Sequence, residues 1–329
     1  MRFSHLVLAT LLVGVIATPA GAAKRAKPAP LDLKAVNEAQ FSDRRGKGIS
    51  PVVIKAQVLL DRARFSPGVV DGRGGENFDR AVAAFAEAQG LAEDGLTKEI
   101  FDKLAATSSE PVLQEYAITA EDVKGPFVEK IPAKMEDMAS LERLGYRNAL
   151  EGLAEKFHMD ESLLKALNPG KAFDKAGGTI VVANVKADRP GEKVGKLVVR
   201  KSEHALHALD KDGKLVAFYP ASIGSEEKPA PSGTQKVERV AQNPTYTYNP
   251  KYKFKGVKSD KPFTIKPGPN NPVGAVWIDL SLESYGIHGS PDPAKVGKTY
   301  SHGCVRLTNW DVKQLAQMVE KGTPVEFVD

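Results

Sequence analysis

The sequence has 329 residues, of which 42% are hydrophobic and 26% charged, and its formal net charge is +5 at pH 7. This composition excludes a chain that is disordered throughout and leaves room for two or three domains of roughly 100–150 residues each. The mild positive charge suits an anionic surface, but no basic run with interleaved aromatic residues supports nucleic-acid binding. A solvated basic surface without a specific partner explains the charge equally well.

The first segment predicts export. Arg2 supplies a positive charge, residues 6–16 form an apolar run, and Ala20-Gly21-Ala22 is a small-residue cleavage site. Together these features predict a secretory signal peptide over residues 1–22. A membrane anchor is disfavoured because about 11 apolar residues fall short of the roughly 20 that span a bilayer. We therefore expect a secreted protein of the periplasm or cell wall, without a membrane anchor after cleavage.

A linker and a small helical domain are expected next. Residues 23–50 begin with a charged, proline-containing stretch that cannot bury a core, which predicts a linker. Within 51–105, apolar residues recur at a spacing of three to four and predict three short helices. Ser50 is a candidate N-cap for the first of these helices, and Pro51 suits its first turn.

The segment 51–105 resembles the small peptidoglycan-binding domain that accompanies many wall enzymes. The matching residues are Asp71-Gly72, Ala81-Val82, Phe85, Gly90-Leu91 and Asp94-Gly95. The segment departs from that family at Ala86, where glutamine is usual. The resemblance implies binding to wall glycan, whereas a generic three-helix module would place the same apolar residues without that role.

A second linker and a second module precede the C-terminal part. Residues 106–138 show little periodicity and are expected to be a linker with some local structure. The segment 139–186 contains two short helical patterns followed by a turn and a strand, an order similar to the LysM wall-binding module. The second helix ends at Asn168, as is common in that module, but no first strand is evident before Ala149. A generic helical spacer is the alternative.

Strands dominate the sequence from residue 194 to 329. Three apolar runs predict strands, and Asp212-Gly213 is a tight turn between two of them. Proline-rich turns punctuate the rest, and only Trp310 to Val319 has a helical pattern. We expect an all-β catalytic domain, a sandwich or small barrel, preceded by a small three-helix domain and a small α+β module.

Cys304 is the only cysteine of the sequence and stands in Tyr300-Ser301-His302-Gly303-Cys304-Val305-Arg306. In a secreted protein a single cysteine suggests a reactive thiol or an intermolecular disulfide. A thiol needs a base to be an effective nucleophile at neutral pH. His302 shares a face with Cys304 in an extended segment, and His288 can approach from a neighbouring strand. The residues alone permit either histidine as the base.

Glycines and an arginine accompany the thiol. Gly289 follows His288 and Gly303 precedes Cys304, which allows close approach of a substrate backbone. The amides of Gly303 and Cys304 are candidate donors to a tetrahedral oxyanion. Arg306 could bind a substrate carboxylate or close a structural ion pair. A zinc site from the histidines and Cys304 is disfavoured, because the spacing is not a common zinc pattern.

The C-terminal segment resembles the L,D-transpeptidase catalytic domain, also called YkuD, over about residues 194–329. The resemblance rests on His288-Gly289, the run Ser301-His302-Gly303-Cys304-Val305-Arg306 and Asn309, supported by the turn at 231–234 and by Gly322-Thr323-Pro324-Val325. Motifs with several residue types at fixed spacing are specific. The resemblance implies an enzyme with a cysteine nucleophile that needs neither cofactor nor metal.

Carried over by position, the family pattern makes Cys304 the nucleophile and His288 the general base. His302 and the amides of Gly303 and Cys304 would line the oxyanion site, with Ser301 beside them, and the carbonyl of Gly289 would orient His288. Of the two roles considered for Arg306, our prediction is substrate binding. Three nearby aspartates are interpreted as loop and surface residues, namely Asp279, Asp292 and Asp311. Trp310 is expected to pack in the core, and the role of Trp277 stays open.

The implied reaction is acyl transfer from a peptidoglycan tetrapeptide stem. Cys304 would attack the L-to-D amide between the third and fourth stem residues and release D-alanine. The acceptor would be an amine of another stem, a lysine of a wall-linked protein, a free D-amino acid or water, and water would make the enzyme an L,D-carboxypeptidase or murein hydrolase. The alternative from another functional class is a non-catalytic wall-binding protein.

Overall fold

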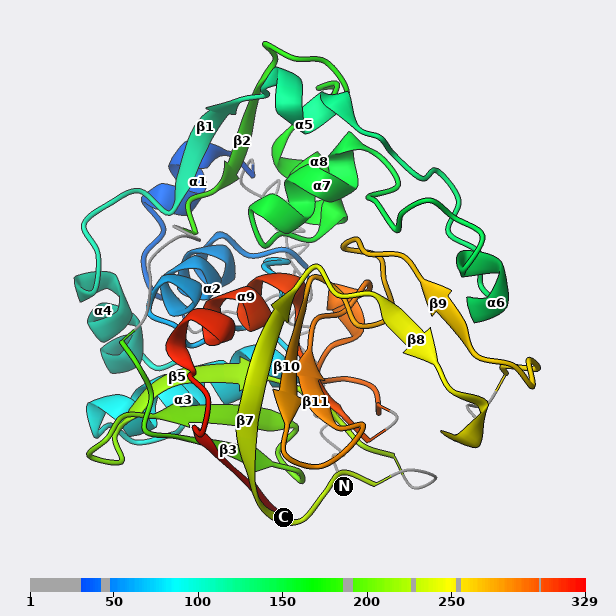
Figure 1. Cartoon of the computed structure of the whole chain (residues 1–329). Coiled ribbons are helices and arrows are strands. Elements are labelled where there is room, and N and C mark those ends of the chain that lie inside the picture. The colour runs from blue at the N-terminus through cyan, green and yellow to red at the C-terminus, as the bar shows by residue number, and fades with distance from the viewer. Residues whose placement is uncertain (1–30, 43–47, 186–191, 226–228, 253–255, 302) are drawn as a thin grey trace, which may run out of the picture. The chain divides into compact units, whose positions relative to one another are not determined.

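The computed structural model describes residues 31–42, 48–185, 192–225, 229–252, 256–301 and 303–329 (Figure 1). The predicted signal peptide, the first residues of the linker and His302 lie outside these ranges. The described chain begins with a short helix, α1 (Leu33–Asn37), within the segment expected to be the first linker.

The three helices expected within 51–105 are confirmed. They are α2 (Pro51–Arg62), α3 (Glu76–Gln89) and α4 (Lys98–Ala106). Pro51 occupies the first turn of α2, while the side chain of its N-cap residue, Ser50, makes no capping hydrogen bond. Helix α3 ends at Gly90, whose φ of 68° lies in the left-handed region that favours glycine.

A strand lies within residues 106–138, the segment expected to be the second linker. Strand β1 (Leu113–Ala117) pairs antiparallel with β2 (Thr179–Ala183). Two short helices follow β1, α5 (Ala120–Lys124) and α6 (Met135–Met138), and then come α7 (Ala149–Lys156) and α8 (Glu161–Leu167). The strand that was not evident directly before Ala149 is therefore β1. It precedes α7 by 31 residues, too far for a short-range sequence pattern to connect the two.

The C-terminal part is built on a mixed sheet of nine strands, in the spatial order β5-β4-β3-β13-β7-β10-β11-β12-β6 (Figure 1). The strands are β3 (Lys196–Arg200), β4 (Ala205–Leu209), β5 (Leu215–Pro220), β6 (Ser222–Ile223), β7 (Gly233–Gln242), β10 (Val276–Leu280), β11 (Gly286–His288), β12 (Val305–Arg306) and β13 (Pro324–Val328). A separate pair, β8 (Tyr246–Tyr248) and β9 (Phe263–Ile265), and two 3₁₀ turns, Pro250–Tyr252 and Pro293–Lys295, complete it.

The sheet curls on itself, because its two edge strands are neighbours in the chain. Only Ala221 separates the end of β5 from the start of β6, so the two edges of the sheet must approach each other. Helix α9 (Asn309–Met318) packs against β10 and β11, and its Val312 and Leu315 are fully buried in the same core as the inner face of the sheet. The predicted all-β, barrel-like catalytic fold is confirmed.

The hydrophobic core of the helical region extends onto β4 and β5, while most of the inner face of the sheet forms a second core. Ala205, Leu215 and Phe218, from β4 and β5, belong to the same buried cluster as the apolar faces of α2, α3 and α4. The backbone joins the two as well, since Phe218 donates its N–H to Arg64 O at 2.8 Å and Ser66 donates to Phe218 O at 2.9 Å. Residues 31–329 therefore pack as one continuous unit.

None of the helices in the described ranges combines the length and the apolar character that a bilayer span requires.

The shared core predicts that the helical region and the sheet unfold together. Phe218 is 2% exposed, so Phe218→Ala should lower the free energy of unfolding by about 3–5 kcal/mol through lost burial and a residual cavity. Denaturant unfolding followed by far-UV circular dichroism should show one transition at a lower midpoint. The control Leu282→Ala, at a position 37% exposed, should change the midpoint little. Two separated transitions would contradict a shared core.

Candidate active site

His288 ends strand β11 and is 5% exposed. Its Nδ1 lies 2.7 Å from the carbonyl oxygen of Gly289. A carbonyl only accepts hydrogen bonds, so Nδ1 must carry the proton and Nε2 is the basic nitrogen of the neutral ring. Burial, reinforced by the positive charge of Arg306, lowers the pKa of His288 to about 3. The imidazole is therefore neutral at physiological pH and has one nitrogen ready to accept a proton.

Strand pairing brings the segment of Cys304 close to the strand of His288. Strands β11 and β12 are parallel, with Ile287 opposite Val305 and His288 opposite Arg306. Cys304 lies in the bend directly before β12. It is partly buried, and its Sγ lies 3.7 Å from Ser284 O, two residues before β11 begins. The thiol therefore lies at the start of the paired strands whose other end carries the imidazole.

Trp277 packs on the imidazole ring of His288. It lies opposite His288 in the antiparallel pair β10 and β11, and the two rings stack with centroids 5.5 Å apart and planes at 19°. A Cβ at Gly286 would lie 2.5 Å from the indole ring, so only glycine lets the ring lie there. Trp277, whose role the sequence left open, thus packs against the imidazole and limits its rotation.

The turn before Cys304 is held by backbone hydrogen bonds. Gly303 has a φ of 96°, in the left-handed region that favours glycine. Ser301 is buried, donates its N–H to Gly224 O at 2.8 Å and donates its hydroxyl to Cys304 O. The described residues thus bring Ser301, Gly303 and Cys304 together at the end of β6, while His302 lies outside them.

Arg306 lies between the two strands that flank β12, opposite His288 on one side and Ser222 on the other. Burial lowers the pKa of its guanidinium, and its Nε has no hydrogen-bond partner among the described residues. This donor of the buried side chain is therefore available to a ligand, and both roles considered for Arg306 stay predictions.

Two further residues near the motif were not anticipated correctly. Burial raises the pKa of the Tyr246 hydroxyl, and the negative charge of an ionised Cys304 adds to the effect. The alternating Thr-Tyr-Thr-Tyr run that contains Tyr246 does not by itself predict that this hydroxyl is buried. The expectation that Asp311 is a surface residue was wrong, because it is 3% exposed and accepts a hydrogen bond from Ser66 Oγ at 3.0 Å. Trp310 is buried at 6% exposure, as expected.

Within the described ranges, no group of three or more His, Cys, Asp or Glu side chains is arranged to hold a metal ion.

The chain matches a family model described as the L,D-transpeptidase catalytic domain, YkuD, over residues 195–327. It is 51% identical over 179 residues to the putative L,D-transpeptidase YkuD of Bacillus subtilis, covering 54% of this chain and 92% of that protein. It is 32% identical over 189 residues to the probable L,D-transpeptidase YbiS of Escherichia coli. That match covers 56% of this chain and 61% of YbiS, so the chain spans about three fifths of the relative's length.

Solved structures of similar proteins match the same part of the chain. The catalytic domain of the Enterococcus faecium L,D-transpeptidase is 25% identical, with a TM-score of 0.32, over 42% of this chain and 98% of that domain. L,D-transpeptidase 3 of Mycobacterium tuberculosis is 18% identical, with a TM-score of 0.35, over 46% of this chain and 68% of that one.

The buried hydrogen bond predicts the ionisation of His288. In Cys304→Ala, which removes the neighbouring thiol, the ring ¹⁵N shifts of His288 should report a neutral Nδ1–H tautomer from pH 8 down to about pH 4. The unfolded imidazole has a pKa of about 6.5, so only the unfolded state binds this proton between pH 6.5 and the folded pKa of about 3. The contribution of His288 to stability therefore falls as the pH drops through this window. A titration midpoint near 6.5 in the folded protein would contradict this account.

Proposed function

Because the chain belongs to the L,D-transpeptidase family, we propose that it is an acyltransferase of the bacterial wall that forms a thioester on Cys304. Its substrate is the tetrapeptide stem of peptidoglycan. The observation that carries this proposal is the buried, neutral His288, with Nδ1 bound to Gly289 O and Nε2 left as the base, on the strand that pairs with the one directly after Cys304.

The first half-reaction forms the acyl-enzyme. His288 Nε2 accepts the thiol proton, and Cys304 Sγ attacks the carbonyl carbon of the L-to-D amide between the third and fourth stem residues. The amides of Gly303 and Cys304 stabilise the resulting oxyanion. The amide C–N bond then breaks, the proton passes from His288 to the leaving nitrogen, and D-alanine departs.

The second half-reaction transfers the acyl group. The side-chain amine of another stem attacks the thioester, gives its proton to His288, and expels the Cys304 thiolate, which His288 reprotonates. The product is a 3→3 cross-link. The same step with a lysine of a wall-linked protein attaches that protein to the wall, with a free D-amino acid it exchanges the terminal residue, and with water it is a carboxypeptidase reaction. Arg306, with its orphaned Nε, binds a carboxylate of a stem.

The proposed substrate is part of the cell wall, so we place the protein there as well. The N-terminal apolar segment of the sequence supports export of the chain to the periplasm or wall. Residues 51–105 and 139–186 serve as wall-binding modules, a role supported by their resemblances and by the order β1, α7, α8 and β2 around the second of them. Neither a cofactor nor a metal takes part in the reaction.

A carbapenem provides a test of the nucleophile, because it acylates through a strained amide without needing an acceptor. Mass spectrometry of the wild-type protein should show one covalent adduct, and the adduct should map to the peptide that contains Cys304. Cys304→Ser should acylate at least about 10³-fold more slowly. An adduct that survives at full level in Cys304→Ser would overturn the assignment.

The base can be tested in the same assay. His288→Gln should slow acylation by roughly 10²–10⁴-fold, because the thiol loses its proton acceptor. The matched control is His207→Gln, which replaces another buried histidine, on strand β4 and outside the site. The control should acylate as the wild type does. Equal rates for His288→Gln and the control would contradict the role of His288.

A further inference from the structure

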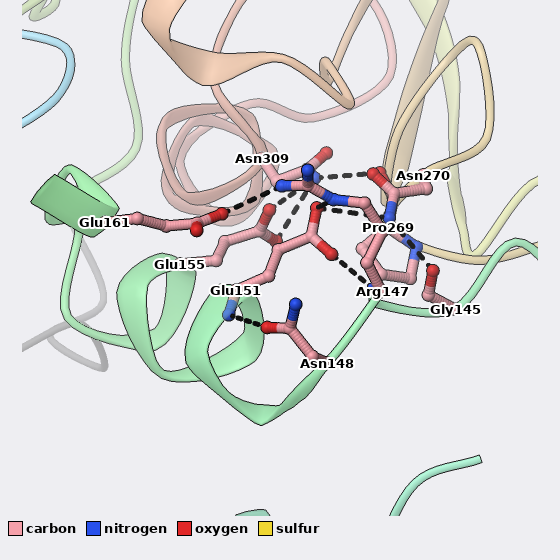
Figure 2. Close-up of polar contacts among 9 residues, drawn as sticks. All are labelled: Gly145, Arg147, Asn148, Glu151, Glu155, Glu161, Pro269, Asn270 and Asn309. Carbon is pink, nitrogen blue, oxygen red and sulfur yellow. Dashed lines mark hydrogen bonds and ion pairs between the residues drawn. The ribbon is translucent and has the colours of Figure 1, made fainter. Parts of the chain in front are cut away.

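We infer that Glu155, in helix α7 outside the transpeptidase domain, is a positioning residue for His288 and acts through the side chain of Asn309. The inference rests on the proposed role of His288 as the base. Figure 2 shows the polar cluster that joins α7 to the start of α9. In this inference the helical region helps to position the catalytic histidine, in addition to its proposed role in wall binding.

The first link is the tight fit of Asn309 against two glycines. Asn309 is the first residue of α9 and is fully buried. Its Oδ1 accepts a hydrogen bond from Ala275 N at 2.8 Å. A Cβ at either Gly274 or Gly289 would lie 2.2 Å from this oxygen, so both positions need glycine to make room for it. The amide of Asn309 is therefore wedged between the segments that carry Gly274 and Gly289.

The second link is the pair Glu155 and Asn309. Asn309 Nδ2 donates to both carboxylate oxygens of Glu155 at 3.1 Å and to Pro269 O at 3.1 Å (Figure 2). A carboxylate and a carbonyl only accept, so the NH₂ end of the amide must face them. The opposite end, Oδ1, then faces the N–H of Ala275. Glu155 thus sets which way the Asn309 amide points.

The third link runs from Gly289 to the base. Gly289 is the residue whose carbonyl holds His288 Nδ1 at 2.7 Å, and its own N–H donates to Val276 O at 3.2 Å. The Oδ1 of Asn309 lies directly against the Cα of this glycine, as the clash distance shows. Any rotation or withdrawal of the Asn309 amide frees the peptide that follows His288. The orientation of the imidazole therefore depends on the side-chain amide of Asn309, which packs between Gly274 and Gly289.

The surroundings of Glu155 favour this bonded arrangement. Tyr146 donates its hydroxyl to Glu155 Oε1 at 3.0 Å, and the positive charge of Lys313 lies nearby. Burial raises the pKa of Glu155, so the carboxylate depends on its donors to stay ionised. Glu155 also lines a cavity of about 710 Å³. A shorter or neutral side chain at position 155 can therefore be accommodated without overpacking a closed core.

The loop before Gly274 is tied to the same helix. Asn270 donates its Nδ2 to Gly145 O at 2.9 Å and to Glu151 Oε1 at 3.3 Å (Figure 2). Leu144 also donates its N–H to Pro267 O at 3.0 Å. Residues 267–270 are thus held by the segment before α7 and by the first turns of α7. Pro269, within this stretch, accepts a hydrogen bond from the Asn309 side chain. These contacts anchor α7 on the catalytic part independently of Glu155, so loss of Glu155 alone should leave the helix in place.

The test compares Glu155→Gln with the wild type in carbapenem acylation. A glutamine keeps the size of the side chain but offers only one acceptor oxygen to Asn309. We expect the acylation rate constant at saturation to fall about tenfold, less than the roughly 100-fold that a 1 Å misplacement can cost. The concentration for half-maximal rate should change by less than about twofold, because Glu155 does not contact the β-lactam. The ring ¹⁵N signals of His288 should shift or broaden.

The matched control is Glu161→Gln, on helix α8. The partner of Glu161 is Arg147, at 2.8 Å, and 33% of the Glu161 side chain is exposed. This variant should acylate as the wild type does. In an Asn309→Ala background, Glu155→Gln should have no further effect, because its path to His288 is already broken.

Three results separate the outcomes. If Glu155→Gln acylates at the wild-type rate while Cys304→Ser does not react, the inference is wrong and the proposed function stands. If Cys304→Ser still forms the adduct, the proposed function itself fails. If Glu155→Gln and Glu155→Ala lower the melting temperature but leave both the saturated rate constant and the His288 signals unchanged, Glu155 is only a structural contact and the inference is overturned.

Discussion

The hydrogen bond from His288 Nδ1 to the carbonyl of Gly289 is the interaction on which the site depends. It selects the tautomer of a buried, neutral imidazole and directs Nε2 away from the backbone. In the proposed mechanism His288 is the base, and it needs no carboxylate as a third member, because the backbone carbonyl already fixes the tautomer. The orientation of the ring therefore depends on how rigidly the peptide of Gly289 is held.

The rest of the structure can be understood as support for that peptide. On one side, Trp277 stacks on the ring of His288 and occupies the space that Gly286 leaves open. On the other side, Asn309 fills the space that Gly289 leaves open, and Glu155 holds Asn309. Strands β11 and β12 pair in parallel, so the strand that ends in His288 lies beside the strand that directly follows Cys304. The helices that share a core with β4 and β5 are thus continuous with the catalytic part.

Short-range patterns in the sequence predicted several helices and the family. Contacts between residues far apart in the sequence could not be predicted from such patterns. The helices α2, α3 and α4 follow from apolar spacing, and membership of the L,D-transpeptidase family follows from the residue types and spacing of the motif that contains His288 and Cys304. The strand β1 was missed because its exposed and buried residues alternate weakly and its partner lies more than 60 positions later. The contact of Glu155 with Asn309 joins residues 154 positions apart, and no period or spacing encodes such a pairing. The burial of Asp311 had the same cause, since its partner Ser66 comes from the distant helical region.

The central claim is that a peptidoglycan stem is carried on Cys304 as a thioester. The most direct measurement is to quench the protein in acid during turnover of a purified disaccharide-tetrapeptide and to analyse the intact chain and its peptides by mass spectrometry. The account predicts an adduct with the mass of the disaccharide-tripeptide acyl group on the Cys304 peptide, released by hydroxylamine, together with free D-alanine. Release of D-alanine at the full rate without any such adduct, or an adduct on another residue, would contradict it.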